Sequence, residues 1–81
     1  MRLDKYLKVS RLIKRRTVAH DAAEMDRIFV NGKAAKPGAQ VKPGDIICIR
    51  FGNSEMTVKV LSTPEHVLKD EAESLYEVIS R

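Results

Sequence analysis

The sequence has little cysteine, few aromatic residues and no long hydrophobic run. Its 81 residues include one cysteine, no tryptophan and 5 % aromatic residues. The single cysteine, Cys48, cannot form an internal disulfide, which fits a reducing compartment. The longest apolar run, residues 46–49, is far shorter than the ~20 residues that cross a bilayer, and no apolar signal-peptide core follows the first residues. We therefore expect a cytoplasmic protein with no membrane partner.

Clusters of residues typical of catalysis or metal binding are also missing. His20 and His66 have no cysteine or carboxylate partner at a recognised metal spacing, and no glycine-rich phosphate-binding fingerprint occurs. Cys48 lies in an apolar segment and is interpreted as a small core residue. A Cys–His nucleophile pair is formally possible, but no oxyanion loop or orienting acid accompanies it. We expect no catalytic residue, no metal and no cofactor, and therefore not an enzyme.

The charge that is present is unevenly distributed. The formal net charge is +4, with ten basic and four acidic side chains in residues 1–36 against five and seven in residues 37–81. A basic half joined to a mildly acidic half creates a directed electric field, which attracts phosphate backbones or acidic membrane surfaces. The alternative interpretation is a generally charged, solvated surface.

Residues 2–26 have the periodicity of helices. In the first helix, the apolar face consists of Leu3, Tyr6 and Leu7, and the opposite face of Asp4, Lys8 and Arg11. A second helix is expected to begin near Thr17 as its N-cap. Its predicted apolar stripe consists of Val18, Ala22 and Met25, flanked by Ala19 and Ala23, and its solvent face of His20, Asp21 and Glu24. The two flanking alanines would let this helix lie close to a neighbour.

The remainder of the chain has the pattern of short strands and turns. Residues 27–30 lead into Asn31-Gly32, a strong hairpin signal because a type I′ turn needs positive φ at both central residues. Further strands are expected at residues 46–51, 56–61 and 76–79, turns at 37–38, 43–45 and 52–54, and an acidic helical turn at 69–76. The expected fold class is α+β, with two N-terminal helices packed on a small, mainly antiparallel β-sheet in one domain, residues 1–81.

The basic run Lys14-Arg15-Arg16 falls where the second helix begins. Cations are unfavourable there, because a helix N-terminus carries partial positive charge and exposes unpaired N–H groups. An anion between them removes the conflict, and arginine grips phosphate with two parallel hydrogen bonds. Arg2, Lys8 and Arg11 can extend the same surface. The alternative interpretation is a solvated run of charge.

Two further residues allow two interpretations each. Asp4 can pair with Lys8 one helical turn away, or it can hold an arginine such as Arg11 or Arg16 in a fixed pose for RNA. Phe29 alternates out of phase with its neighbours in the first strand, so it either packs against the core or helices or offers a stacking face to a base. Packing is the preferred interpretation, because so few aromatic residues make a poor stacking platform.

The motif Arg2-Leu3-Asp4-x-x-Leu7, followed by Ser10-Arg11, Ala19 and Arg27-Ile28-x-Val30-Asn31-Gly32, resembles the RNA-binding domain family named for ribosomal protein S-four. The match covers residues 2–52. The resemblance implies an alpha-L RNA-binding motif, in which two helices and the adjoining hairpin form the RNA surface. The family usually has glycine where this chain has Asp26, and aspartate tolerates the left-handed backbone better than most residues.

Within the family, residues 2–17 and Glu71-Ala72-x-x-Leu75-Tyr76 are similar to a stand-alone bacterial factor of ribosome-associated quality control. This resemblance implies binding to the large ribosomal subunit, contacts to 23S rRNA and the P-site tRNA, and support of the partner RqcH in alanine tailing of stalled chains. It implies a monomer acting in protein biosynthesis. The expected RNA-binding residues are Arg2, Asp4, Lys8, Arg11, Lys14, Arg15 and Arg16.

Three alternatives remain open from the sequence. One is a heat-shock-type protein of the same family that recycles large subunits with trapped nascent chains. Such proteins carry a longer, basic C-terminal extension, whereas this sequence ends after the acidic residues Glu71, Glu73 and Glu77. The second is the targeting module of an RNA-modifying enzyme. The third is a protein-interaction module that uses the acidic C-terminal half.

Overall fold

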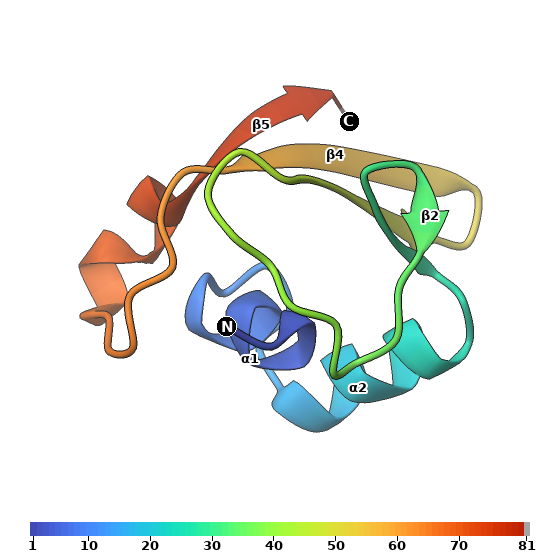
Figure 1. Cartoon of the computed structure of the whole chain (residues 1–81), viewed down its shortest axis with the longest axis horizontal. Coiled ribbons are helices and arrows are strands. Elements are labelled where there is room, and N and C mark those ends of the chain that lie inside the picture. Colours follow the sequence, from blue (N-terminus) through green and yellow to red (C-terminus); the bar gives the residue numbers. More distant parts are fainter. Residues whose placement is uncertain (81) are drawn as a thin grey trace.

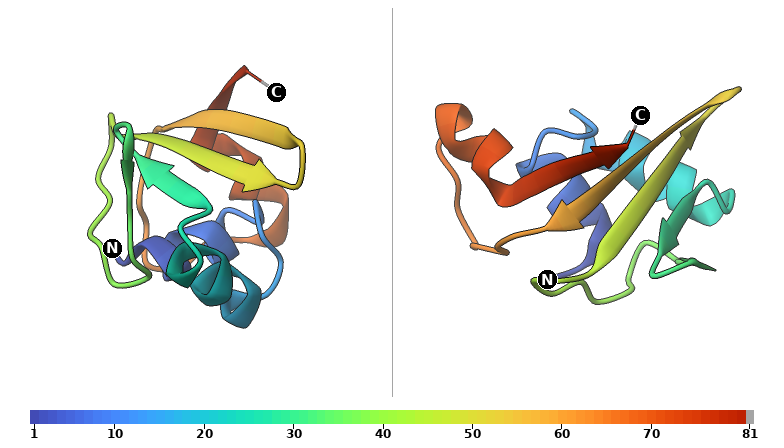
Figure 2. Two further views of the ribbon diagram at one scale, coloured as in Figure 1. Left: turned by 90° about the vertical axis from the view of Figure 1, so that its right-hand side faces the viewer. Right: turned by 90° about the horizontal axis from the view of Figure 1, so that it is seen from above.

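The computed structural model describes residues 1–80, except for the side chain of Lys69 (Figure 1). Its elements in chain order are α1 (Leu3–Val9), α2 (Arg16–Glu24), β1 (Ile28–Val30), β2 (Lys33–Ala34), β3 (Ile46–Phe51), β4 (Ser54–Val60), the 3₁₀ helix η1 (Lys69–Leu75) and β5 (Tyr76–Ser80). The five strands form one sheet in the order β2-β1-β3-β4-β5, and every neighbouring pair is antiparallel. Figure 2 shows both α-helices on the same side of this sheet. The expected α+β fold is confirmed.

The strand predictions hold with small shifts at the ends. β3 has the predicted bounds, while β4 begins at Ser54, so the intervening turn is only Gly52-Asn53. At the β1–β2 turn, Asn31 and Gly32 have φ of 52° and 83°. These values are the pair of positive φ angles that the hairpin signal predicted. Asp26 has φ 56°, so it adopts the left-handed conformation for which the family usually has glycine.

The core lies between α1 and the sheet. Leu3, Tyr6 and Leu7 are fully buried, as predicted, and meet inward-facing strand residues such as Ile47 and Val58. The Tyr6 hydroxyl donates a 2.7 Å hydrogen bond to the Leu75 carbonyl oxygen, which joins the first helix to the end of η1. Burial of this hydroxyl raises the pKa of Tyr6, and the nearby Tyr76 adds to the effect.

The second helix begins within one residue of the predicted start, but the predicted N-cap and two of the three residues of the predicted apolar stripe are wrong, while Ala22 does pack against the core. The helix begins at Arg16, after an extended N-cap residue, Arg15, so Thr17 is its second residue and not its cap. Val18 and Met25 are 50 % and 60 % exposed. The buried residues are Ala19 and Ala23, which were predicted only as flanking positions. Small side chains on this face let α2 approach the rest of the molecule closely, and that approach turns the larger side chains outward.

The interpretations of Cys48 and Phe29 as core residues are also wrong. Ile47 and Ile49 are fully buried, so the strand alternation places Cys48 on the sheet face away from the helices, where it is half-buried. Phe29 pairs with Cys48 in register and shares that face. The Arg50 guanidinium lies 4.6 Å from the centre of the Phe29 ring. The aromatic ring therefore packs against a cation at the outer surface.

Candidate nucleic-acid interface

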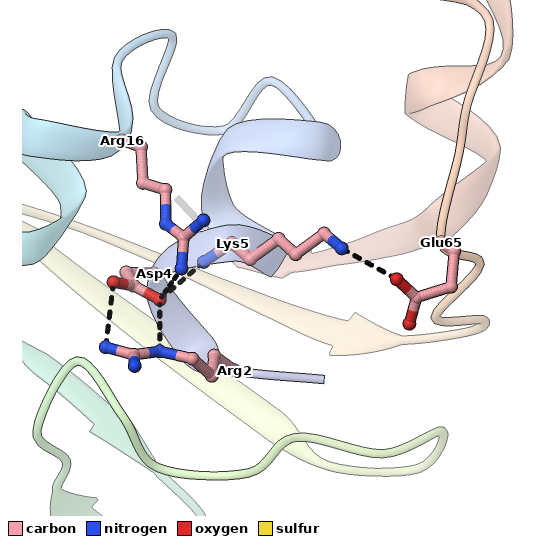
Figure 3. A network of polar contacts seen from close by, with 5 residues as sticks. All are labelled: Arg2, Asp4, Lys5, Arg16 and Glu65. Carbon is pink, nitrogen blue, oxygen red and sulfur yellow. Dashed lines mark hydrogen bonds and ion pairs between the residues drawn. The ribbon is translucent and has the colours of Figure 1, made fainter.

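A buried carboxylate, Asp4, organises the basic surface of the two helices (Figure 3). Its side chain accepts hydrogen bonds from Arg2 (Nε to Oδ1 at 3.2 Å, Nη2 to Oδ2 at 3.3 Å) and from Arg16 (Nη2 to Oδ1 at 3.4 Å). The backbone N–H of Lys5 donates to the same carboxylate at 2.8 Å. The structure thus brings together residues from two segments of the predicted site, and Asp4 contacts Arg16, one of the two arginines considered for it from the sequence.

Asp4 was predicted on the face of the first helix opposite its apolar residues, and the structure shows that it is nevertheless buried, with only 2 % exposed. The segment 37–39 covers it: the Pro37 carbonyl accepts the Asp4 N–H at 3.1 Å, and the Ala39 carbonyl accepts the Leu3 N–H at 2.7 Å. These bonds satisfy two free N–H groups of the first turn of α1. The chain beyond the hairpin therefore completes the helix and encloses the carboxylate.

The electrostatic balance at Asp4 favours the ionised form. Burial by itself would raise the pKa of this carboxyl. The hydrogen bonds from Arg2 and Arg16, the positive charge of Arg16 and the Lys5 backbone N–H outweigh burial and lower the pKa below its usual value of 3.8. At neutral pH the centre therefore contains one buried negative charge and two arginines.

The two arginines remain accessible at this centre. The side chains of Arg2 and Arg16 are 50 % and 49 % exposed, while that of Asp4 is 3 % exposed. A guanidinium has five N–H donors in a planar fork, so each side chain can bind Asp4 with one edge and an anion with another. A held arginine also loses less conformational entropy when it binds. The exposed guanidinium edges of Arg2 and Arg16 are therefore suited to binding a phosphate group.

A hollow of about 290 Å³ adjoins this centre. It is lined by Asp4, Arg16, Thr17, His20 and Asp21. From the sequence, His20 and Asp21 were expected on the solvent face of the second helix and Thr17 as its cap, so all three were missed as lining residues. The available signal for His20 was its spacing, because positions four residues apart lie next to each other on a helix surface.

Arg11 and Lys14 lie in a different environment. They line a second hollow of about 410 Å³ together with Ser10, Asp70, Ala72, Glu73 and Tyr76. Arg11 has a left-handed backbone with φ 62°, in the turn that separates the two helices. The structure therefore divides the predicted basic surface, because these two cations face acidic side chains of η1.

The last two predicted site residues, Lys8 and Arg15, are exposed. Lys8 is in the last turn of α1, and Arg15 is the N-cap of α2. Also on α1, the Lys5 side chain donates a 2.7 Å hydrogen bond to Glu65, which lowers the pKa of that carboxyl (Figure 3).

Within residues 1–80, no group of three or more potential metal ligands comes together. No helix among these residues has the length and apolar character needed to cross a membrane.

The sequence matches one family over more than half of its length. Residues 1–47 match the S4 domain. The RQC P-site tRNA stabilizing factor of Halalkalibacterium halodurans is 58 % identical over 78 residues, covering 96 % of this chain and 89 % of the relative. The protein of the same name from Listeria monocytogenes is 57 % identical over 79 residues, covering 98 % and 86 %.

A solved structure supports the same grouping. The trimeric structure of heat shock protein 15 from Vibrio cholerae has a TM-score of 0.89 and 32 % sequence identity, covering 99 % of this chain and 82 % of that one. The resemblance predicted from the residues 2–52 motif is therefore confirmed. This chain belongs to the S4 domain family and is similar over almost its whole length to proteins named RQC P-site tRNA stabilizing factor.

Proposed function

We propose that this protein binds RNA phosphates through the arginines held on Asp4 and so stabilises a P-site tRNA during ribosome quality control. The observation that carries the proposal is one buried carboxylate that fixes Arg2 and Arg16 while leaving about half of each side chain exposed. Relatives more than 50 % identical over almost the whole chain bear the name of such a factor. The charge of the N-terminal half is of the sign that phosphate binding requires.

The finer proposal follows the resemblance of residues 2–17. The protein would act in the cytoplasm as a monomer on obstructed large ribosomal subunits, contacting 23S rRNA and the P-site peptidyl-tRNA. It would support RqcH-dependent alanine tailing of the stalled chain. All of residues 1–81 would work as one RNA-binding domain, with its motif core at residues 2–52.

The proposed site residues have graded roles. Arg2 and Arg16 contact phosphate directly, and Asp4 is a positioning residue that orients them. Lys8 and Arg15 are exposed and contribute attraction at longer range. Arg11 and Lys14 contribute less than their charge suggests, because the hollow they line also contains Asp70 and Glu73.

The test is co-sedimentation of the full chain with isolated large ribosomal subunits at several salt concentrations. Arg16→Ala should weaken binding about tenfold or more and flatten the dependence of log K on log salt by about one unit for each phosphate that is no longer neutralised. Arg16→Glu should abolish co-sedimentation. Arg50→Ala is the matched control, because this arginine is also about half exposed but pairs with Glu55 on the opposite face of the sheet. Equal binding by the Arg16 and Arg50 variants would contradict the proposed surface.

A second candidate function is that of a heat-shock-type factor that recycles subunits with trapped chains. The fold similarity to heat shock protein 15 over 99 % of this chain favours it. The two functions differ in their product, so stalled chains can be probed for alanine tails in cells that lack the gene. Loss of the tails supports the tRNA-stabilizing function, and unchanged tails support recycling.

A further inference from the structure

The hollow beside Arg16 contains a feature that phosphate binding does not explain. Asp21 lines it, and its carboxylate side chain is 78 % exposed. An exposed carboxylate repels a phosphate but attracts N–H donors. The acid therefore suits a part of the RNA other than its backbone, immediately next to the arginines that suit the backbone.

The hollow also contains a flat ring. The His20 side chain is about half exposed, and its Nδ1 lies 3.6 Å from Oδ1 of Asp21. Arg16, one helical turn before His20, adds a second planar group at the same rim. Unpaired RNA bases stack on histidine rings and on guanidinium planes. The volume of about 290 Å³ lies just below the ~300–1,000 Å³ range of typical ligand sites, and it suits one base better than a longer segment.

We propose that this hollow binds a single unpaired guanine of the RNA, with the base against His20 and Arg16 and its Watson–Crick edge on the Asp21 carboxylate. Guanine presents two N–H donors side by side on that edge, N1–H and the 2-amino group, and a carboxylate accepts two parallel donors. Adenine and cytosine each offer one amino donor beside an acceptor nitrogen, and uracil offers one N–H between two carbonyls. An acceptor-only group therefore selects guanine.

The proposal rests on the proposed RNA-binding function and adds base selectivity to it. Arg16 links the two, because its Nη2 is held on Asp4 and its remaining donors can reach the phosphate of the same nucleotide. Thr17, the remaining α2 side chain in the hollow, is next to Arg16 and can bond a ribose hydroxyl. The site would then hold the base, sugar and phosphate of one nucleotide.

The experiment measures binding of the full chain to labelled five-nucleotide RNAs by fluorescence anisotropy at low salt. The RNAs are uridine tracts whose central nucleoside is guanosine, inosine or adenosine. A bidentate base contact contributes about 1–3 kcal/mol of discrimination, so guanine should bind roughly 5- to 150-fold more tightly than adenine. Inosine lacks the 2-amino group and should fall between them.

Two variants separate the base contact from general electrostatics. Asp21→Asn should reduce the guanine-to-adenine ratio to about one, because an amide offers one acceptor and a competing donor. Glu24→Gln removes the same charge from an exposed position on the same helix outside the hollow, so its ratio should stay unchanged. The decisive readout is the ratio of the affinities for the guanine and adenine RNAs, because a general electrostatic effect changes both affinities equally. An Asp21→Asn variant that keeps the wild-type ratio would overturn the guanine site.

The outcomes also separate this inference from the proposed function. Equal affinity for guanine and adenine, or no binding of any of the three RNAs, overturns the guanine site. In either case, co-sedimentation with large subunits that depends on Arg16 leaves the phosphate-binding function standing. If co-sedimentation with large subunits does not depend on Arg16, the proposed function itself is overturned.

Discussion

Two arginine–carboxylate groups on opposite faces of the molecule show what burial adds to an ion pair. On the helix side, Asp4 is 3 % exposed and is shared by Arg2 and Arg16. On the outer sheet face, Glu55 is 55 % exposed, forms an ion pair with Arg50 at 3.1 Å and accepts a 3.7 Å hydrogen bond from the Cys48 thiol. The contact distances are similar, but the exposed pair is screened by water and each partner can move away. The buried carboxylate holds two arginines by hydrogen bonds away from water, and such fixed donors are the property that a binding surface needs.

The largest effect on stability is expected from Asp4→Asn. The amide cannot accept all four hydrogen bonds and removes the charge that balances Arg2 and Arg16, so the free energy of unfolding should fall by about 1–3 kcal/mol. Urea denaturation at neutral pH measures the change. Glu55→Gln is the matched variant on the exposed pair and should cost less than ~1 kcal/mol. Equal losses of unfolding free energy in Asp4→Asn and Glu55→Gln would contradict the expected difference between a buried and an exposed carboxylate.

The same centre should produce a dependence of stability on acid. The pKa of Asp4 is lower in the fold than its usual value of 3.8, so the unfolded chain takes up the proton first as the pH falls. The stabilisation is complete well above pH 3.8 and is lost as the pH falls through the lower folded value. Urea midpoints measured downward from pH 6 should show this loss, and it should be weaker in Asp4→Asn. Asp4→Asn should still lose some stability in acid, because the pKa of the exposed Glu65 is also lowered in the fold. This loss should be smaller than the loss in the wild-type protein.

A smaller effect is expected from Tyr6→Phe, which removes a buried hydrogen bond without removing a charge. The Leu75 carbonyl would lose its 2.7 Å donor, at a cost of about 1–1.5 kcal/mol. Because the folded pKa of Tyr6 is raised above 10.0, the wild-type protein should also lose stability as the pH rises past 10, and the variant should lose less. Thermal unfolding at pH 7 and at alkaline pH measures both. An identical alkaline loss in the two proteins would contradict the role of the hydroxyl.

The smallest effect is expected from Asp26→Gly, which removes another exposed ion pair. Asp26 pairs with Lys36 at 3.3 Å, with both side chains more than 60 % exposed, and it has φ 56°. Glycine relieves the left-handed strain, while the removed pair contributes little. We expect a melting temperature that is unchanged or raised by an amount equivalent to less than ~1 kcal/mol. A clear drop in the melting temperature would show that the exposed Asp26–Lys36 pair stabilises the fold more than expected for an exposed ion pair.

Much of the fold was predictable because the signals are local. The turn at Asn31-Gly32 follows from the φ values those residues tolerate, and β3 follows from an apolar segment between two turns. The faces were harder to predict. Residues 46–49 are all apolar, so their composition does not say which side the helices cover, and Cys48 was placed inward although it lies outward.

The candidate site was predictable in composition and not in arrangement. The sequence by itself specifies an S4-type chain with a basic N-terminal half and an acid, Asp4, among its arginines. Whether that acid is buried depends on segment 37–39, which is more than 30 residues away along the chain. The approach of η1 to Arg11 and Lys14 depends on equally distant packing. Charge is a property of each residue, whereas burial, which gives Asp4 its hold on Arg2 and Arg16, arises only when remote segments exclude water together.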